Sequence, residues 1–231
     1  MTEVQSESRH AVVTGASSGI GAAVVRHLLE EGWLVTGLSR RAPDFVDDRF
    51  TWLEADLDDF SRLDAQARAL GAADAVVHAA GLQHSAPLGR LNPEHALQMW
   101  RIHVGAAEVV VNAMAPELRD GARIVLVGSR TMTGNAGKSQ YVATKSALTG
   151  MARSWAAELV DRGITVNVVA PGPTDTPMLT DPARAHTPPR LPPLGQLIEP
   201  REVAGLIGFL LSPLGRNVTG QAIVQCAGAS L

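Results

Sequence analysis

Several residue types are scarce in the 231-residue sequence, which has one cysteine (Cys226), one tyrosine (Tyr141) and two lysines (Lys138 and Lys145). A single cysteine excludes an intrachain disulfide and a cysteine metal cluster. The histidines show neither HxxxH nor HExxH spacing, so we expect no metal site. No apolar run is long enough to span a bilayer, and the first ten residues lack an apolar signal core. We therefore expect a cytoplasmic protein that has no membrane partner.

The composition limits the fold and the partners further. Aromatic residues make up 4% and charged residues 19% of the chain, so the core of a globular domain would be aliphatic and rich in alanine. The formal net charge of -3 gives no reason to expect nucleic acid or an acidic membrane surface as partner. The length suits one α/β domain with a sizeable core.

Short apolar runs alternate with helix-compatible segments along the whole chain. This alternation predicts a single-domain Rossmann-type fold, a doubly wound parallel sheet of about seven strands with helices on both faces. The expected domain spans residues 10–231 after a flexible lead-in at 1–9, with a proline-rich substrate loop at about 173–200. Expected strands are 10–14, 34–38, 51–56, 73–78, 123–127, 165–169 and 222–225, and expected helices are 22–31, a short run to about 70, 93–118, 139–162 and 202–211.

A glycine-rich turn joins the first expected strand to the first expected helix. Its residues are Gly15-Ala16-Ser17-Ser18-Gly19-Ile20-Gly21, with the spacing GxxxGxG in place of the general dinucleotide fingerprint GxGxxG. A turn of this kind can merely reverse the chain. At a strand–helix junction, however, it presents backbone N–H groups and a helix N-terminus, which favours a phosphate site.

The second expected strand ends at Ser39-Arg40-Arg41. An acidic residue at this place in a dinucleotide fold would bind the ribose 2′-hydroxyl, but the chain has a hydroxyl and two guanidinium groups. A solvated basic corner is the alternative. Next to a phosphate-binding turn, the pattern favours a 2′-phosphate and therefore NADP over NAD.

Tyr141 and Lys145 lie four residues apart in an expected helix, so their side chains share one face. A phenol has a pKa of about 10 and transfers protons poorly at neutral pH. A neighbouring cation favours the phenolate and would move this pKa toward neutrality. The pair indicates proton transfer to or from an oxygen, although a lone YxxxK can also be a surface lysine beside a packing tyrosine.

Taken in order, these motifs resemble the short-chain dehydrogenase/reductase family over nearly the whole chain, from His10 to Leu231. The resemblance rests on the run from Thr14 to Gly21, Ala79-Ala80-Gly81, Ser129 with Tyr141 and Lys145, the run from Asn167 to Thr176, and Thr219-Gly220-Gln221. It implies an oxidoreductase acting on a small-molecule carbonyl or alcohol, with Tyr141 as general acid/base and Ser129 holding the substrate oxygen. It also implies that Lys145 lowers the pKa of Tyr141 and binds the nicotinamide ribose.

The resemblance, the glycine-rich turn and the basic corner at Ser39-Arg40-Arg41 together give the expected cofactor site. Asp56 and Leu57 would flank the adenine. The full set is Gly15, Ser17, Ser18, Gly19, Ile20, Gly21, Ser39, Arg40, Arg41, Asp56, Leu57, Ala79, Ala80, Gly81, Tyr141, Lys145, Pro171, Gly172, Thr174 and Thr176.

The sequence departs from the family pattern at three places. Ala79 replaces an expected asparagine, Cys226-Ala227-Gly228 replaces Asp-Gly-Gly, and His103 aligns with the asparagine that holds a proton-relay water in the family. A histidine titrating near pH 6.5 could serve that relay and would give the rate an acid limb. The alternative is a histidine packed in its helix.

Three functions remain open from the sequence. An NADP(H)-dependent carbonyl/alcohol oxidoreductase is the first, an NAD-dependent alcohol or diol dehydrogenase the second, and a nucleotide-binding regulator of the same fold the third. In relatives the two long helices form subunit interfaces, and here they carry Trp100 and Trp155. The resemblance therefore predicts a homodimer or homotetramer.

Overall fold

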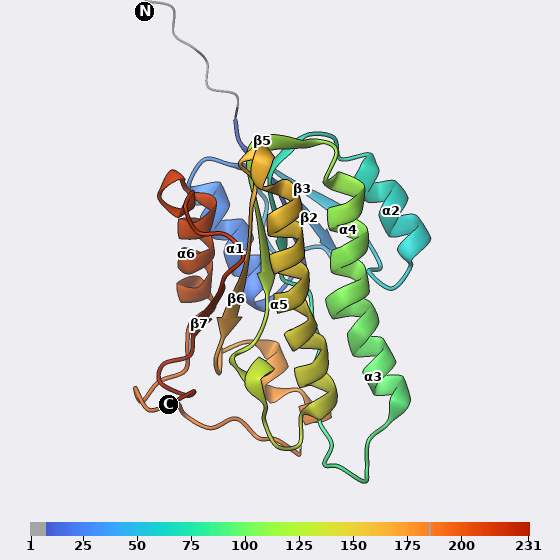
Figure 1. Cartoon of the computed structure of the whole chain (residues 1–231), viewed down its shortest axis with the longest axis vertical. Helices are drawn as coiled ribbons and strands as arrows, with labels where there is room; N and C mark the ends of the chain where they lie inside the picture. The colour runs from blue at the N-terminus through green and yellow to red at the C-terminus, as the bar shows by residue number, and fades with distance from the viewer. Residues whose placement is uncertain (1–7, 185) are drawn as a thin grey trace, which may run out of the picture.

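The centre of the molecule is a seven-stranded sheet, and the computed structural model describes residues 8–184 and 186–231 around it. The strand order is β3-β2-β1-β4-β5-β6-β7, and all neighbouring strands are parallel. The predicted doubly wound sheet is confirmed (Figure 1). The strands are β1 (His10–Thr14), β2 (Leu34–Ser39), β3 (Phe50–Glu54), β4 (Ala73–His78), β5 (Leu118–Val127), β6 (Thr165–Pro171) and β7 (Ala222–Gln225).

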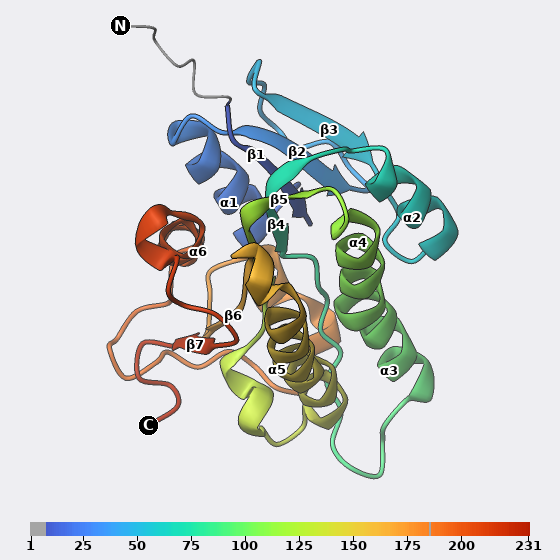
Figure 2. The same ribbon diagram turned by 45° about the horizontal axis from the view of Figure 1, so that its top comes forward.

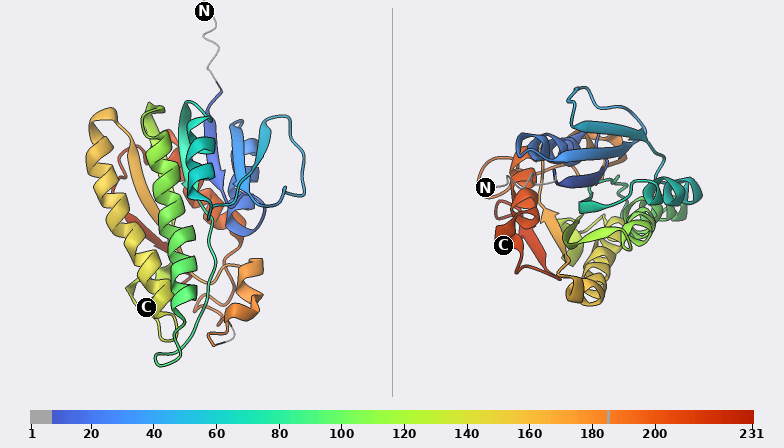
Figure 3. Two further views of the ribbon diagram at one scale, coloured as in Figure 1. Left: turned by 90° about the vertical axis from the view of Figure 1, so that its right-hand side faces the viewer. Right: turned by 90° about the horizontal axis from the view of Figure 1, so that it is seen from above.

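Helices cover both faces of the sheet (Figures 2 and 3). On one face α1 (Gly19–Glu30) packs against α6 (Pro200–Leu211), and their valines and leucines form one aliphatic core with the strands. On the other face α2 (Phe60–Arg68), α4 (Ala106–Met114) and α5 (Ser139–Leu159) form the second core. Because both faces are covered, the central strands are buried on both sides, and all seven residues of β6 are buried.

Local capping fixes several helix starts. Asp59 accepts a hydrogen bond from the Arg62 N–H at the start of α2 (3.1 Å), and Asn92 accepts one from the Glu94 N–H at the start of α3 (Pro93–Trp100, 2.9 Å). At α6 the carboxylate of Glu202 accepts from the Glu199 N–H (2.7 Å). Each cap satisfies a backbone donor that has no partner within its helix.

The expected continuous helix at 93–118 is wrong in two respects. A π-helical turn, η1 (Arg101–Gly105), separates α3 from α4, and β5 begins at Leu118, five residues before the expected start. Within η1 the carbonyl oxygen of Ile102 accepts a hydrogen bond from His78 Nε2 (3.0 Å). A Cβ atom on Gly105 would overlap the ring of Phe60, so glycine at this position lets η1 pack closely against α2.

Short 3₁₀ turns and loops gather at the carboxyl ends of the strands. They include η2 (Arg130–Thr133) after β5, and η4 (Pro177–Thr180) and η5 (Pro182–Arg184) after β6. The remaining turns are η3 (Val160–Arg162) and η6 (Pro213–Gly215). A bridge between Thr174 and Ile198 closes the segment that follows β6, which lies at the lower end of the view in Figure 1. In parallel α/β sheets this edge is where ligands bind.

No helix within the described ranges is both long and apolar enough to cross a membrane.

Candidate active site

A cavity of about 680 Å³ opens at the carboxyl ends of β1, β4, β5 and β6. It brings together residues from the glycine-rich turn, from the strand end after His78 and from the start of α5. Of the predicted site residues, the following line it: Gly15, Ser18, Gly19, Ile20, Ala79, Ala80, Gly81, Ser129, Tyr141, Lys145, Pro171, Gly172, Thr174 and Thr176. Segments far apart in the sequence thus meet in one place, as the predicted sheet order requires.

The glycine-rich turn is closely packed against its neighbours. Gly15 has a φ of +71°, and a Cβ atom there would lie 2.8 Å from the Ala80 Cα atom. A Cβ atom on Gly21 would overlap the carbonyl oxygen of Gly15. These positions need glycine because the turn, the strand end and the first turn of α1 touch through their backbones. Ser18, Gly19 and Ile20 at the start of α1 line the cavity, and a helix N-terminus in this position suits a pyrophosphate.

Seven predicted cofactor residues lie outside the walls of the cavity. Ser39 is buried, its hydroxyl donates to the Arg41 carbonyl oxygen (2.7 Å), and Trp52 Nε1 donates to the Ser39 carbonyl oxygen (3.2 Å). The Gly15 N–H donates to the carbonyl oxygen of Leu38 (2.9 Å), so this corner adjoins the glycine-rich turn. The seven are Ser17, Gly21, Ser39, Arg40, Arg41, Asp56 and Leu57, and their cofactor roles stay predictions.

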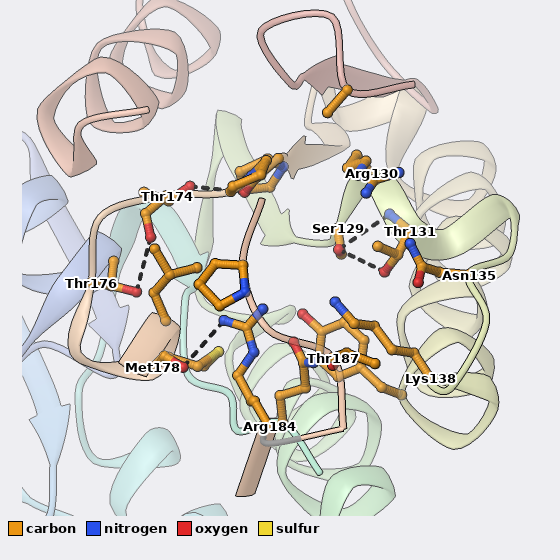
Figure 4. A pocket seen from close by; sticks show the side chains of 18 of the residues that line it. Ser129, Arg130, Thr131, Asn135, Lys138, Thr174, Thr176, Met178, Arg184 and Thr187 are labelled. Carbon is orange, nitrogen blue, oxygen red and sulfur yellow. Dashed lines mark hydrogen bonds between the residues drawn. The ribbon is translucent and has the colours of Figure 1, made fainter. Parts of the chain in front are cut away.

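Ser129, Tyr141 and Lys145 share the inner end of the cavity. The Ser129 hydroxyl lies 2.9 Å from the Thr131 hydroxyl and accepts from the Thr131 N–H (3.2 Å), which fixes its position on η2 (Figure 4). The buried ammonium of Lys145 donates to the Val127 carbonyl oxygen (2.8 Å), which ties α5 to the end of β5. Burial lowers the pKa of Lys145 to about 7.

The electrostatics of Tyr141 differ from the expectation. Burial raises the pKa of the Tyr141 phenol, while hydrogen bonding from Ser129 and the positive charge of Arg184 act in the opposite direction. The expected lowering of this pKa by Lys145 is therefore not what the structure shows. The reason is that desolvation of the phenolate outweighs the nearby charge, and Lys145 points its ammonium at a backbone carbonyl.

His103 lies deep in η1 with both ring nitrogens engaged. The Leu82 N–H donates to Nε2 (3.1 Å), so Nε2 carries no proton and Nδ1 donates to the Thr144 hydroxyl oxygen (2.8 Å). The Thr144 hydroxyl in turn donates to the Tyr141 carbonyl oxygen (2.9 Å). His103 therefore connects the loop after β4 to the start of α5, and its ring meets the Tyr141 ring edge-on with centroids 5.6 Å apart.

The expectation that His103 titrates near pH 6.5 is wrong. Burial, followed by the charges of Lys145 and His78, lowers the pKa of His103 well below its usual value. Protonation would also break the hydrogen bond from Leu82. His78 is similarly buried and neutral, between the Thr14 hydroxyl (2.9 Å) and Ile102, and burial lowers its pKa to about 3. We propose that His103 positions the site and does not carry protons.

The structure adds residues that the sequence interpretation did not assign to the site. Arg130, Lys138 and Arg184 line the cavity on the side of Ser129 and Tyr141, together with Gln83 and Thr187. Arg130 directly follows Ser129 and Lys138 lies three residues before Tyr141. This proximity in the sequence could have indicated that both belong to the site. Arg184 comes from a segment without periodicity, so only the folded chain reveals it.

A parallel doubly wound sheet with a glycine-rich turn at its first strand defines a Rossmann-type nucleotide-binding protein. The family model described as Enoyl-(Acyl carrier protein) reductase matches residues 15–230. The chain belongs to the short-chain dehydrogenase/reductase family of oxidoreductases.

Relatives and solved structures agree with this assignment. The 3-oxoacyl-[acyl-carrier-protein] reductase of Vibrio cholerae is 33% identical over 94% of this chain and 95% of its own. The cyclic-di-GMP-binding biofilm dispersal mediator protein of Escherichia coli is 33% identical over 90% of this chain and 92% of its own. A blue fluorescent protein from a metagenomic library, solved in complex with NADPH, has a TM-score of 0.84 at 32% identity, covering 96% of this chain and 98% of the other.

Proposed function

We propose that this protein is an NADP(H)-dependent oxidoreductase that interconverts a carbonyl group and a secondary alcohol, with Tyr141 as the general acid/base. The observation that carries the proposal is the convergence of Ser129, Tyr141 and Lys145 on one cavity with the glycine-rich turn. A nucleotide bound along the turn would end beside a phenol and a hydroxyl. A protein that only binds nucleotides has no need of that pair.

The residues at the cofactor end suit a dinucleotide. The backbone of Gly15 and Gly21 leaves no space for a side chain, and the N-terminus of α1 favours negative charge. Pro171, Gly172, Thr174 and Thr176 line the cavity where the nicotinamide end would lie. When bound, the nicotinamide supplies or accepts the hydride, and the protein positions and polarises the reacting carbonyl.

The proton chemistry falls to Tyr141. Because burial raises its pKa, the phenol is protonated at neutral pH and can donate to a carbonyl oxygen as that oxygen gains negative charge. Ser129 would hold the same oxygen through its hydroxyl. Lys145, with a pKa of about 7, can exchange a proton with its surroundings near neutrality and would also hydrogen-bond the cofactor ribose.

Choice of NADP(H) is supported by Arg40 and Arg41, whose exposed side chains follow the buried Ser39 at the end of β2. Ser39, Arg40 and Arg41 include no acidic residue, and a guanidinium can bind a 2′-phosphate through charge-assisted hydrogen bonds. The relative solved with NADPH supports the same choice. The names of the Vibrio relatives make 3-oxoacyl thioesters a reasonable first class of carbonyl substrate to assay.

Tyr141→Phe tests the proposal. The change removes the phenolic proton and little volume, so turnover should fall by about 10²–10⁴-fold while NADPH binding stays within a few-fold of wild type. Steady-state rates at the nicotinamide absorbance band and NADPH titration by fluorescence would measure the two effects. Retention of more than a tenth of wild-type activity would exclude Tyr141 as the acid.

A second candidate function is a nucleotide-binding regulator, favoured by the similarity to the Escherichia coli cyclic-di-GMP-binding protein. The two functions separate in one experiment. Cyclic-di-GMP that binds by calorimetry in a protein without carbonyl reductase activity would support the regulator, whereas turnover that depends on Tyr141 supports the enzyme.

A further inference from the structure

Three cationic side chains surround the substrate side of the cavity. Arg130 follows Ser129 in η2, Lys138 lies three residues before Tyr141, and Arg184 ends η5. Figure 4 shows the side chains of Lys138 and Arg184 pointing into the same space, with Arg130 beside Ser129. Arg130 and Lys138 come from the connection between β5 and α5 and Arg184 from η5, so the meeting of these two segments is a property of the fold.

Among the described residues of the cavity no acidic side chain pairs with these cations, although the last residue, Leu231, also lies on the cavity wall. The lining also contains Arg190 and His186, and it includes no aspartate or glutamate side chain. Within the described ranges no carboxylate forms a salt bridge with Arg130, Lys138 or Arg184. Asp181 acts on Arg184 electrostatically from outside the cavity.

Arg184 is the most constrained of the three. Only 9% of its surface is exposed, Nη1 donates to the Met178 carbonyl oxygen (3.2 Å), and its buried Nε has no hydrogen-bond partner. A guanidinium stays charged at any physiological pH, so burial without an anion is costly. Its positive charge also acts to lower the pKa of the Tyr141 phenol, and both residues line the same cavity.

Lys138 is a second partly buried cation on the cavity wall. Burial, then the charges of Arg184 and Arg130, lowers its pKa to about 8. Two neutral groups on the same walls, Gln83 Nε2 and Thr187 Oγ1, are also buried without a partner. An oxyanion among these groups would satisfy the unpaired donors and offset the repulsion between the cations.

We propose that the carbonyl substrate carries an oxyanion, a carboxylate or phosphate, held by Arg130, Lys138 and Arg184 next to Ser129 and Tyr141. This inference rests on the proposed function, because it names the substrate class of the same site. The oxyanion is unchanged in the reaction and fixes the carbonyl beside the phenol. A neutral ketone of equal size leaves the cations unpaired.

Matched substrate pairs test the proposal with NADPH as reductant. One arm compares acetoacetate, 4-oxopentanoate and 5-oxohexanoate with their methyl esters, which varies the spacing between carboxylate and ketone. The other arm compares dihydroxyacetone phosphate with dihydroxyacetone, which separates a phosphate from a carboxylate preference. In at least one pair the anion should have a kcat/KM at least ~10-fold higher, equivalent to about 1.4 kcal/mol. Added salt should reduce this preference.

Arg184→Gln and Lys138→Gln should each reduce the ratio of anion to neutral kcat/KM by about tenfold or more. Arg216→Gln is the matched control, since Arg216 is an exposed arginine outside the cavity, and it should keep the wild-type ratio. A ratio of one or below in every turned-over pair would overturn the anion site and leave the reductase proposal standing.

If no pair is turned over, calorimetry on the NADPH-loaded protein with glutarate, dimethyl glutarate and inorganic phosphate shows whether the cavity binds an anion. Binding of an anion that Arg184→Gln abolishes supports the anion site, even though none of these ketones is reduced. Absence of anion binding in wild type overturns the site.

Discussion

At the residue scale, the side chains around Tyr141 show how burial changes the proton affinity of a group. Tyr141, Lys145 and His103 are all buried, and in each case desolvation is the largest influence on the pKa. Burial favours the neutral form of every group, so it raises the pKa of the phenol and lowers those of the ammonium and the imidazole. The result is a protonated Tyr141 beside a Lys145 that titrates near neutral pH, an arrangement suited to supplying protons.

Ser39 and Arg40 decide the cofactor preference in our proposal. Wild type should use NADPH with a higher kcat/KM than NADH, and Arg40→Ala should lower that ratio by about tenfold or more, because it removes charge-assisted bonds worth about 1.5–3 kcal/mol. Ser39→Asp should shift the preference toward NADH, since a carboxylate repels the 2′-phosphate and can bind the 2′-hydroxyl.

Steady-state kinetics with both cofactors measure this preference. Arg62→Ala, a change at an exposed arginine of α2, is the control and should leave the ratio unchanged. A wild-type preference for NADH would refute the role of the basic corner.

At the element scale, the glycine-rich turn and the first turn of α1 depend on close backbone contact. Gly21→Ala should destabilise the protein by about 1–3 kcal/mol and weaken NADPH binding, because the added Cβ would overlap the Gly15 carbonyl oxygen. Gly205 in α6 is the matched control, since nothing lies within 4 Å of a Cβ atom there. Gly205→Ala should stabilise by about 0.5–1 kcal/mol through helix propensity.

Urea unfolding of both variants measures the two changes. Equal effects of the two substitutions would mean that propensity alone acts at Gly21, and the close packing of the turn would then be excluded as its cause.

Elements with local sequence signals could be predicted, and those that depend on tertiary contacts could not. The strands at 73–78 and 222–225 were predicted with the observed bounds, because each is a short β-branched or apolar run between turn residues. The π-turn at η1 escaped prediction, because it depends on contacts with His78 and Phe60 from distant segments. The predicted Ser129, Tyr141 and Lys145 do meet in one cavity, whereas the neutral state of His103 required knowledge of its burial.

At the scale of the whole molecule, net charge and local charge point in different directions. The chain has a formal net charge of -3, from which the sequence indicated no anionic partner such as nucleic acid. The cavity nevertheless gathers Arg130, Lys138, Lys145, Arg184 and Arg190, and no acidic side chain among the described residues lines it. A cleft lined by one sign of charge concentrates ligands of the opposite sign even when the surface as a whole is weakly acidic. A negative net charge therefore argues against binding of an extended polyanion such as nucleic acid, but it does not argue against binding of a small anionic substrate in a cationic cavity.

The two buried histidines make global stability depend on pH. His78 and His103 are neutral in the folded protein, with pKa values of about 3 for His78 and well below the usual value for His103, whereas in the unfolded chain both titrate near 6.5. Below pH 6.5 the unfolded state thus binds more protons, and stability falls as pH falls toward the folded pKa values. A histidine that stays neutral in the folded protein over this range lowers the free energy of unfolding by about 1.2 kcal/mol from pH 6 to pH 5, so two such histidines would lower it by ~2.4 kcal/mol.

Urea unfolding at pH 6.0, 5.5 and 5.0 measures this drop. His103→Asn removes one of the two protonation sites, so it should halve the drop whatever its effect on absolute stability. Met99→Leu is the control, because it alters a fully buried side chain without a titrating group, and its pH dependence should match that of wild type. The lowered lysine pKa values act above this window, since Lys145 and Lys138 have pKa values of about 7 and about 8. A drop in His103→Asn as large as in wild type would show that His103 is protonated in the folded protein, and the neutral, positioning role would be wrong.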